Sequence, residues 1–132
     1  MAQPETTPAG FAEEIGIEWL NLDPDDARAR IAIEPRHLQP FGIVHGGVFA
    51  ALAESLTSAA TYGAVHEQGM VAMGQANDTT FLRPIGEGHA NAAATPRHRG
   101  RTTWVWDVEI TDDGGRVCAL SRMTIAVRPA RD

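Results

Sequence analysis

Residues 46–66 form a run of helix-forming residues that meets no break until Gly63, and most of the run is alanine, leucine, valine or phenylalanine. A run of this kind predicts one long helix. Because its apolar residues fall on nearly every face, the helix has to be covered by a sheet on one side and by something else on the other. The remainder of the chain must be arranged around this segment.

The flanking sequence predicts strands. Residues 15–23 and 26–34 alternate around the turn signal at 23–26, which indicates a hairpin. Four further strand-like runs follow the helix, at residues 69–84, 88–100, 102–113 and 115–128. Turn signals at 85–88, 98–101 and 112–115 separate them and predict an antiparallel meander. With a short helix at 7–16 and a loop at 35–44, the predicted class is α+β, a helix packed on one antiparallel sheet.

Composition narrows the class of protein. A chain of 132 residues is expected to form one domain, 1–132. The net charge of −6 argues against a nucleic-acid surface, although all eleven basic residues are arginine. No apolar run approaches the ~20 residues of a membrane span, and no secretory signal is evident, so we expect a cytoplasmic protein. Cys118 is alone and is expected to be a small buried hydrophobe.

Two polar residues interrupt the apolar helix. Glu54 and Ser58 lie four residues apart, hence on one face, where the hydroxyl can hydrogen-bond the carboxylate or a water beside it. A glutamate on a helix commonly reaches solvent or pairs with an arginine. In an otherwise apolar helix, however, a carboxylate costs several kcal/mol unless it is partnered, neutralised or used. Glu54 is therefore a candidate catalytic group.

The sequence His45-Gly46-Gly47 precedes the helix. The first backbone N–H groups of a helix have no partner within it and point outward. With the helix dipole behind it, the Gly46 N–H can hold a thioester or ester carbonyl oxygen as negative charge develops there. A simple turn before the helix is the alternative interpretation.

The stretch QPFGIVHGG, the glutamate nine residues after His45 and the hydroxyl four residues later resemble the hotdog-fold acyl-CoA thioesterases. Segments 69–89, 102–108 and 121–129 further resemble the Arthrobacter-type 4-hydroxybenzoyl-CoA thioesterases, and the resemblance covers about residues 30–131. Thioesterases of phenylacetate degradation and of menaquinone and enterobactin synthesis are less distinctly similar. Some of these have aspartate where Glu54 stands, so the glutamate favours the Arthrobacter-like group.

The resemblance implies a role for each matching residue. Glu54 takes the place of the catalytic carboxylate and Gly46 that of the oxyanion donor. Gln39 matches a glutamine that contacts the thioester region, His45 a histidine that braces the loop, and Ser58 a hydroxyl that positions water. Positions associated with the nucleotide and phosphates of CoA are matched by Arg83, Thr102 and Arg131. Arg101 stands at a serine position, where an arginine can still bind phosphate.

Other polar and aromatic residues receive structural interpretations. His37, His66, His89 and His98 have no metal-ligand spacing, and neither a metal nor a cofactor is expected. Asp78 lies on a strand expected to line the site, although a solvated or turn-pairing aspartate is the commoner outcome. Trp104 and Trp106 share one face of their strand and are assigned to core or interface before aryl-ring binding.

The predicted function is hydrolysis of an aromatic acyl-CoA, similar to 4-hydroxybenzoyl-CoA, in aromatic degradation. Glu54 either attacks the thioester carbonyl or deprotonates a water that does so. One alternative is a hotdog hydratase or dehydratase, against which the spacing of Glu54 from His45 argues. The other is a non-catalytic acyl-CoA-binding protein, whose regulatory members carry a DNA-binding segment that we do not expect in this acidic chain.

The spacing of the two proposed site residues on the helix leads to the hypothesis of a homodimer. Gly46 and Glu54 are eight residues apart, or ~12 Å along the axis at ~1.5 Å per residue. One carbonyl cannot touch both in one subunit. We therefore expect two antiparallel helices across a two-fold axis, with each site taking Gly46 from one chain and Glu54 from the other. The family resemblance further implies that dimers assemble into a homotetramer.

Overall fold

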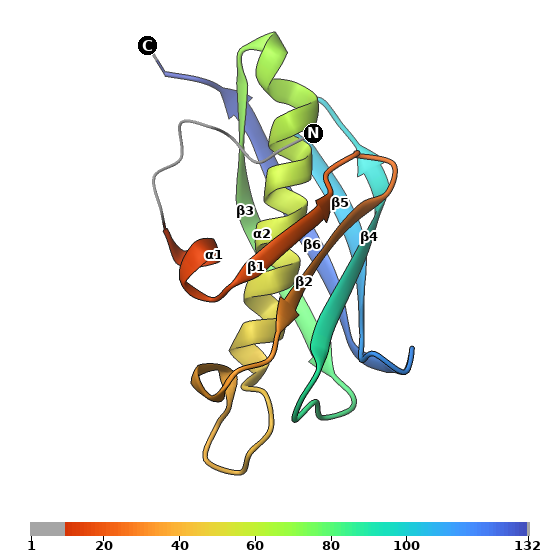
Figure 1. Ribbon diagram of the computed structural model, residues 1–132. Coiled ribbons are helices and arrows are strands. Elements are labelled where there is room, and N and C mark those ends of the chain that lie inside the picture. Colours follow the sequence, from red (N-terminus) through yellow and green to blue (C-terminus); the bar gives the residue numbers. More distant parts are fainter. Residues whose placement is uncertain (1–9, 132) are drawn as a thin grey trace.

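A computed structural model describes residues 10–131 and places one long helix, α2 (Gly46–Val65), against a six-stranded antiparallel sheet that curls around it (Figure 1). In sheet order the strands are β1 (Ile17–Asn21), β2 (Ala27–Ala32), β4 (His89–Arg99), β5 (Thr103–Thr111), β6 (Val117–Pro129) and β3 (Met70–Phe81). Within residues 10–131, three short helices complete the fold: α1 (Phe11–Glu14), η1 (Pro35–His37) and η2 (His66–Gln68). The predicted hotdog architecture is confirmed.

The order of the strands corrects one prediction. Strands β4, β5 and β6 form the expected meander, but β3 pairs with β6 and not with its neighbour in sequence, β4. The segment after β3 crosses the end of the sheet, where the Leu82 N–H donates to the Cys118 oxygen (2.8 Å) and the Ile33 N–H to the Gly88 oxygen (2.8 Å). The turn signal at 85–88 therefore belongs to a crossing connection, because two bonded strands, β5 and β6, separate β4 from β3.

Helix α2 buries one face on the sheet, through residues spaced three and four apart: Phe49, Leu52, Ala53, Leu56, Thr57, Ala60, Thr61 and Val65. Its opposite strip, which includes Gly47, Glu54 and Ser58, is exposed or half-buried. The helix continues through Gly63 to Val65. The prediction that the sheet covers one side only is thus confirmed.

Polar groups inside the core satisfy one another. The Thr57 hydroxyl donates to the Ala53 oxygen (2.9 Å), the Thr61 hydroxyl to the Thr57 oxygen (2.7 Å) and the Trp106 indole to the Thr61 hydroxyl (2.9 Å). Trp104 and Trp106 are both buried, as predicted for core residues. Cys118 is buried as well, and this burial raises the pKa of its thiol. Cys118 is thus a small buried residue, as predicted.

The N-terminal part of the chain agrees with its predicted elements. Strands β1 and β2 form the expected hairpin, and α1 falls within the predicted 7–16 helix, whose residues 7–9 lie outside the described part. His37 is structural: its Nδ1 accepts from the Glu34 N–H (2.9 Å) and its Nε2 lies 2.7 Å from the Ile15 oxygen. No helix among residues 10–131 is long and apolar enough to cross a membrane.

Strand β3 forms one edge of the sheet and contains a bulge. Gly74 pairs with Ile125 and Ala76 with Thr124, so Gln75 is an extra residue between them. Side chains alternate between the two faces of a strand, and one inserted residue shifts that alternation. Beyond the bulge, Asn77 and Thr79 face the helix side of the sheet, which the hydrogen bonds of Asn77 to α2 make plain.

Candidate active site

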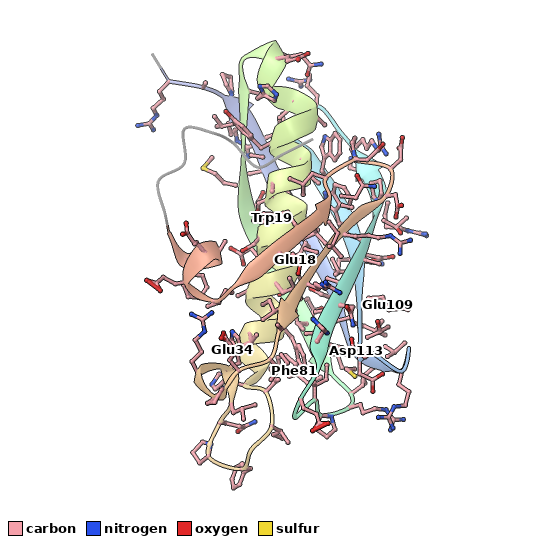
Figure 2. The ribbon with its side chains drawn as sticks, in the orientation of Figure 1. Glu18, Trp19, Glu34, Phe81, Glu109 and Asp113 are labelled. Carbon is pink, nitrogen blue, oxygen red and sulfur yellow. The ribbon has the colours of Figure 1, made fainter. Side chains whose placement is uncertain are left out.

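An apolar cavity of about 470 Å³ lies at the N-terminal end of α2. Residues 43–47 and 81–84 line it together with Gln39 and Phe49. Ligand sites in proteins commonly have volumes of ~300–1,000 Å³ and a mostly apolar lining. Figure 2 labels Phe81, which lies beside this end of the helix, with its ring centroid 6.3 Å from that of Phe49. The cavity thus suits an apolar group of modest size.

A tight loop brings Gln39 to the cavity. The Gln39 N–H donates to the Ile43 oxygen and the Gly42 N–H to the Gln39 oxygen, each at 2.9 Å. Gly42 has a φ of 82°, in the left-handed region that favours glycine. At the tip of the loop the Phe41 side chain is 84% exposed. The QPFG stretch of the motif is therefore a compact turn beside the helix N-terminus.

His45 caps the helix and leaves one N–H group free. Its Nδ1 accepts from the Gly47 N–H (2.8 Å) and its backbone oxygen from the Val48 N–H (2.9 Å). The Gly46 N–H has no acceptor among residues 10–131. A Cβ atom on Gly46 would lie 2.9 Å from the Phe81 ring, so the ring packs directly on this glycine. The geometry fits a donor that faces a ligand at close range.

Glu54 lies in the middle of α2 and is exposed in the single chain, so the predicted burial cost does not arise there. Its Oε1 accepts from Asn77 Nδ2 (3.2 Å), and the same nitrogen donates to the Ala50 oxygen (2.9 Å). No hydrogen bond joins Ser58 to Glu54 in the described part of the chain, and the other possibility, a bond from Ser58 to a water beside the carboxylate, stays a prediction. Sequence reasoning missed Asn77 because the bulge that turns it inward has no clear sequence signal.

The four residues predicted to contact CoA separate into two groups. Arg83 lines the cavity at the N-terminal end of α2. Arg101 lines a second hollow, of about 380 Å³, beside the C-terminal end of the helix. Thr102 is next to it and accepts from the Val127 N–H (2.9 Å), and Arg131 follows Ala130, whose N–H donates to the Gly69 oxygen (2.8 Å). Twenty helical residues at ~1.5 Å each separate the two groups by ~30 Å.

A third hollow, of about 520 Å³, lies on the outer face of the sheet and contains none of the predicted site residues. Its lining is polar: Asp107 pairs with Arg122 (3.0 Å) and Arg97 (3.4 Å), and Asp78 lies nearby. Asp78 thus faces away from α2, in agreement with the solvated alternative. Within residues 10–131 no three His, Cys, Asp or Glu side chains are placed to hold a metal ion.

Comparison with protein families matches residues 41–119 to the Thioesterase superfamily. The chain belongs to this superfamily. The Mycobacterium tuberculosis protein Rv1847 is 40% identical over 92% of this chain and 88% of its own length. The proofreading thioesterase EntH of Cronobacter turicensis is 35% identical over 92% of this chain and 88% of its own length. Full-length relatives therefore support the family.

Solved structures agree with the sequence matches. A mutant of the thioesterase PA1618 from Pseudomonas aeruginosa superposes with a TM-score of 0.85 at 35% identity, covering 89% of this thioesterase and 85% of that chain. The PaaI protein from the phenylacetic acid degradation operon of E. coli has a TM-score of 0.80 at 28% identity, covering 90% and 84%. The predicted enzyme class, a thioester hydrolase, is confirmed. EntH and PaaI are of the kinds that the sequence motifs resemble less distinctly, so the assignment to the Arthrobacter-type group stays a prediction.

Proposed function

We propose that this thioesterase hydrolyses an aromatic acyl-CoA, similar to 4-hydroxybenzoyl-CoA, to the free acid and CoA. The observation that carries the proposal is the helix N-terminus: the free Gly46 N–H opens onto an apolar cavity that contains the rings of Phe49 and Phe81. Aromatic rings pack favourably against other rings, so this cavity suits an aryl group. The likeness to PaaI, from a phenylacetic acid degradation operon, supports an aromatic substrate.

The proposed chemistry divides the reaction between two points on α2. Glu54 either attacks the thioester carbonyl, which gives a mixed anhydride that water then cleaves, or it deprotonates a water that attacks directly. In both routes the carbonyl oxygen becomes negative beside the Gly46 N–H and the positive end of the helix dipole. The CoA sulfur leaves as the thiolate. Gln39 contacts the thioester, His45 braces the loop and Ser58 positions water.

The site requires a second chain in this proposal. Gly46 and Glu54 are ~12 Å apart along one helix, so a single carbonyl meets both only if an antiparallel partner supplies one of them. Strand β3, twelve residues long, is an edge strand with no further strand beside it among residues 10–131. Such an edge invites pairing with another chain. The strip of α2 around Glu54 is built of small residues that allow close approach: Gly47, Ala50, Ala51, Ser55 and Ser58.

The same dimer reunites the two groups of CoA-binding residues. If Gly46 of one helix lies beside Glu54 of the other, Val65 of that second helix extends eleven residues, or ~16 Å, beyond the first helix's N-terminus. The group near Val65 would then lie beyond the cavity at the N-terminal end of the partner's helix; this group consists of Arg101, Thr102 and Arg131. The pantetheine arm of CoA separates its thioester from its phosphates in the same way. The homotetramer rests on the family resemblance alone, and a cytoplasmic location stays a prediction.

A thiol-release assay over benzoyl, 4-hydroxybenzoyl, phenylacetyl and aliphatic CoA esters tests the proposal. We expect the highest kcat/KM with an aromatic ester. We also expect Glu54→Gln to lower kcat by at least ~100-fold while substrate still binds, a typical scale for the loss of a positioned base. Preference for aliphatic esters would contradict the aromatic substrate. Tight binding of acyl-CoA without release of CoA from any ester would favour the non-catalytic alternative.

A further inference from the structure

Asn77 makes three hydrogen bonds through one side chain. Its Nδ2 donates to the Ala50 oxygen (2.9 Å) and to Glu54 Oε1 (3.2 Å), both on helix α2. Its Oδ1 accepts from the Thr79 hydroxyl (2.6 Å), which lies 2.9 Å from the Ser121 hydroxyl on β6. A chain of polar groups therefore runs from the inner face of the sheet to the carboxylate of Glu54.

The partners determine the direction of every bond in this chain. Two acceptors, a backbone oxygen and a carboxylate oxygen, face the same Asn77 atom, so that atom is the amide nitrogen. Its oxygen then faces Thr79, whose single hydroxyl hydrogen goes to it. Because Thr79 has no second hydrogen to give, the Ser121 hydroxyl is the donor in the 2.9 Å bond between Ser121 and Thr79. Donation thus runs from Ser121 through Thr79 to the Asn77 amide, which donates to Ala50 and Glu54, and the amide cannot flip without placing oxygens against oxygens.

The bulge in β3 puts two residues in the right place for this arrangement. Gly74, before the bulge, and Asn77, after it, both lie on the helix side of the strand. A Cβ atom on Gly74 would be 2.9 Å from Glu54 Oε2, so glycine leaves room for the second carboxylate oxygen. If β3 were a regular strand, with Gln75 part of the alternation and no bulge, Asp78 would take the inward position and place a second carboxylate beside the first.

We propose that Asn77 is a positioning residue, which holds Glu54 Oε1 so that Oε2 is presented to the thioester or to the attacking water. The proposal rests on the catalytic role proposed for Glu54. An exposed glutamate otherwise samples many rotamers, and catalysis is sensitive to misplacement on the scale of an ångström. Thr79 and Ser121 hold the Asn77 amide in the orientation that donates.

The test compares two asparagines. Asn91 makes the same type of contacts far from Glu54: its Nδ2 donates to the Thr111 oxygen (3.2 Å) and to Asp113 Oδ1 (3.0 Å). We expect Asn77→Ala to lower kcat on the order of 10- to 100-fold and to change KM by no more than about twofold. The matched control Asn91→Ala is expected to lower the melting temperature while kcat and KM remain those of the wild type.

Further variants separate positioning from folding. Thr79→Val keeps the shape of the side chain but removes the donor to Asn77 Oδ1, so a smaller loss of kcat is expected. If the Asn77→Ala protein does not fold, the Thr79→Val variant serves as the test, and wild-type kcat in it would overturn the inference. In a Glu54→Gln background, Asn77→Ala should leave the residual rate unchanged, because no carboxylate remains to be held.

Wild-type kcat in a folded Asn77→Ala protein would overturn the inference. An equal loss of kcat in Asn91→Ala would overturn it too, since both changes would then act through folding. These outcomes are distinct from failure of the proposed function, which a fully active Glu54→Gln protein would show.

Discussion

The two ends of helix α2 offer a ligand different chemistry. At the N-terminal end, the Gly46 N–H and a cavity with two aromatic rings favour a small apolar group that develops negative charge. At the C-terminal end, Arg101 lines a smaller hollow, of about 380 Å³, beside Trp104, and the helix carbonyls there favour a cation over an anion. The first end suits an acyl group, whereas at the second end it is the Arg101 guanidinium, and not the helix, that can pair with a phosphate. Because ~30 Å separate them in one chain, the proposed dimer is needed to bring them into one site.

The largest expected effect concerns the N-terminal end. Gly46→Pro removes the N–H group while proline is well tolerated at the first position of a helix, and Gly46→Ala keeps the N–H group and adds a similar Cβ atom near Phe81. Relative to Gly46→Ala, we expect Gly46→Pro to lower kcat on the order of 100- to 1,000-fold. Steady-state kinetics with circular dichroism as a folding control would measure this. Equal rates in the two variants would remove the oxyanion role.

A mixed dimer tests whether the two chains share a site. One chain carries Glu54→Ala and the other carries Gln39→Ala with Gly46→Pro, and two affinity tags isolate the mixed species. One site then has every defect and the other has none. We expect each parent to be at least ~100-fold impaired and the mixed dimer to recover about half of the wild-type activity. A mixed dimer as inactive as its parents would show that each chain forms its own site.

Replacing the arginine at either end of α2, Arg83 or Arg101, is expected to have a smaller effect, on KM. If the dimer places both near CoA phosphates, Arg83→Ala and Arg101→Ala each raise KM for a full CoA ester by about 10-fold, since a charge-assisted hydrogen bond contributes roughly 1.5–3 kcal/mol. A short pantetheine thioester, which has no nucleotide, should show little change. If either variant affects both substrates equally, its arginine does not bind the nucleotide.

The smallest expected effect is on thermal stability and concerns Asp113, a residue away from both ends of α2. The hydrogen bond from His89, and then that from Asn91, lowers the pKa of Asp113 from its usual value of 3.8. A carboxyl with a lowered pKa in the folded state stabilises the protein above its unfolded pKa, and this contribution is lost as the pH falls through the folded pKa. Asp113→Asn should lower the melting temperature slightly at about pH 7 and reduce its fall toward about pH 3.

Thermal unfolding at the two pH values would measure this change, and activity at about pH 7 should stay unchanged. Figure 2 shows the reason: Asp113 lies by the sheet, away from helix α2. A loss of kcat in Asp113→Asn would mean that the site extends beyond the two ends of the helix.

Features with local signals could be predicted from the sequence. The uninterrupted run of residues 46–66 predicted α2, and the turn at 23–26 predicted the β1–β2 hairpin, because neighbouring residues alone determine both. Gly46 was placed correctly at the helix start and Glu54 eight residues along it, since a helix converts spacing directly into geometry. The hydrogen bond to Glu54 Oε1 comes from Asn77 on β3, a residue of another element that helix spacing does not identify.

Features that depend on distant residues could not be predicted. The partner of β3 is β6, some fifty residues away, and a turn signal says nothing about such pairing. The bulge at Gln75 decides whether Asn77 or Asp78 faces the helix, and a one-residue shift reverses every later side chain. The sequence motif includes Glu54 but not Asn77, so it could not predict which residue donates a hydrogen bond to the carboxylate.

The pairing of β3 with the C-terminal strand also has a consequence for how the chain folds. The innermost helix and the strand that follows it are synthesised before β6, yet β6 bonds to both β3 and β5 and so joins two separate parts of the sheet. Contacts between residues so distant in sequence are slow to form, and an unpaired strand is prone to aggregate until they do. A nascent chain lacking its last strand therefore carries β3 with both edges open, and closure of the whole sheet waits for residues 117–129.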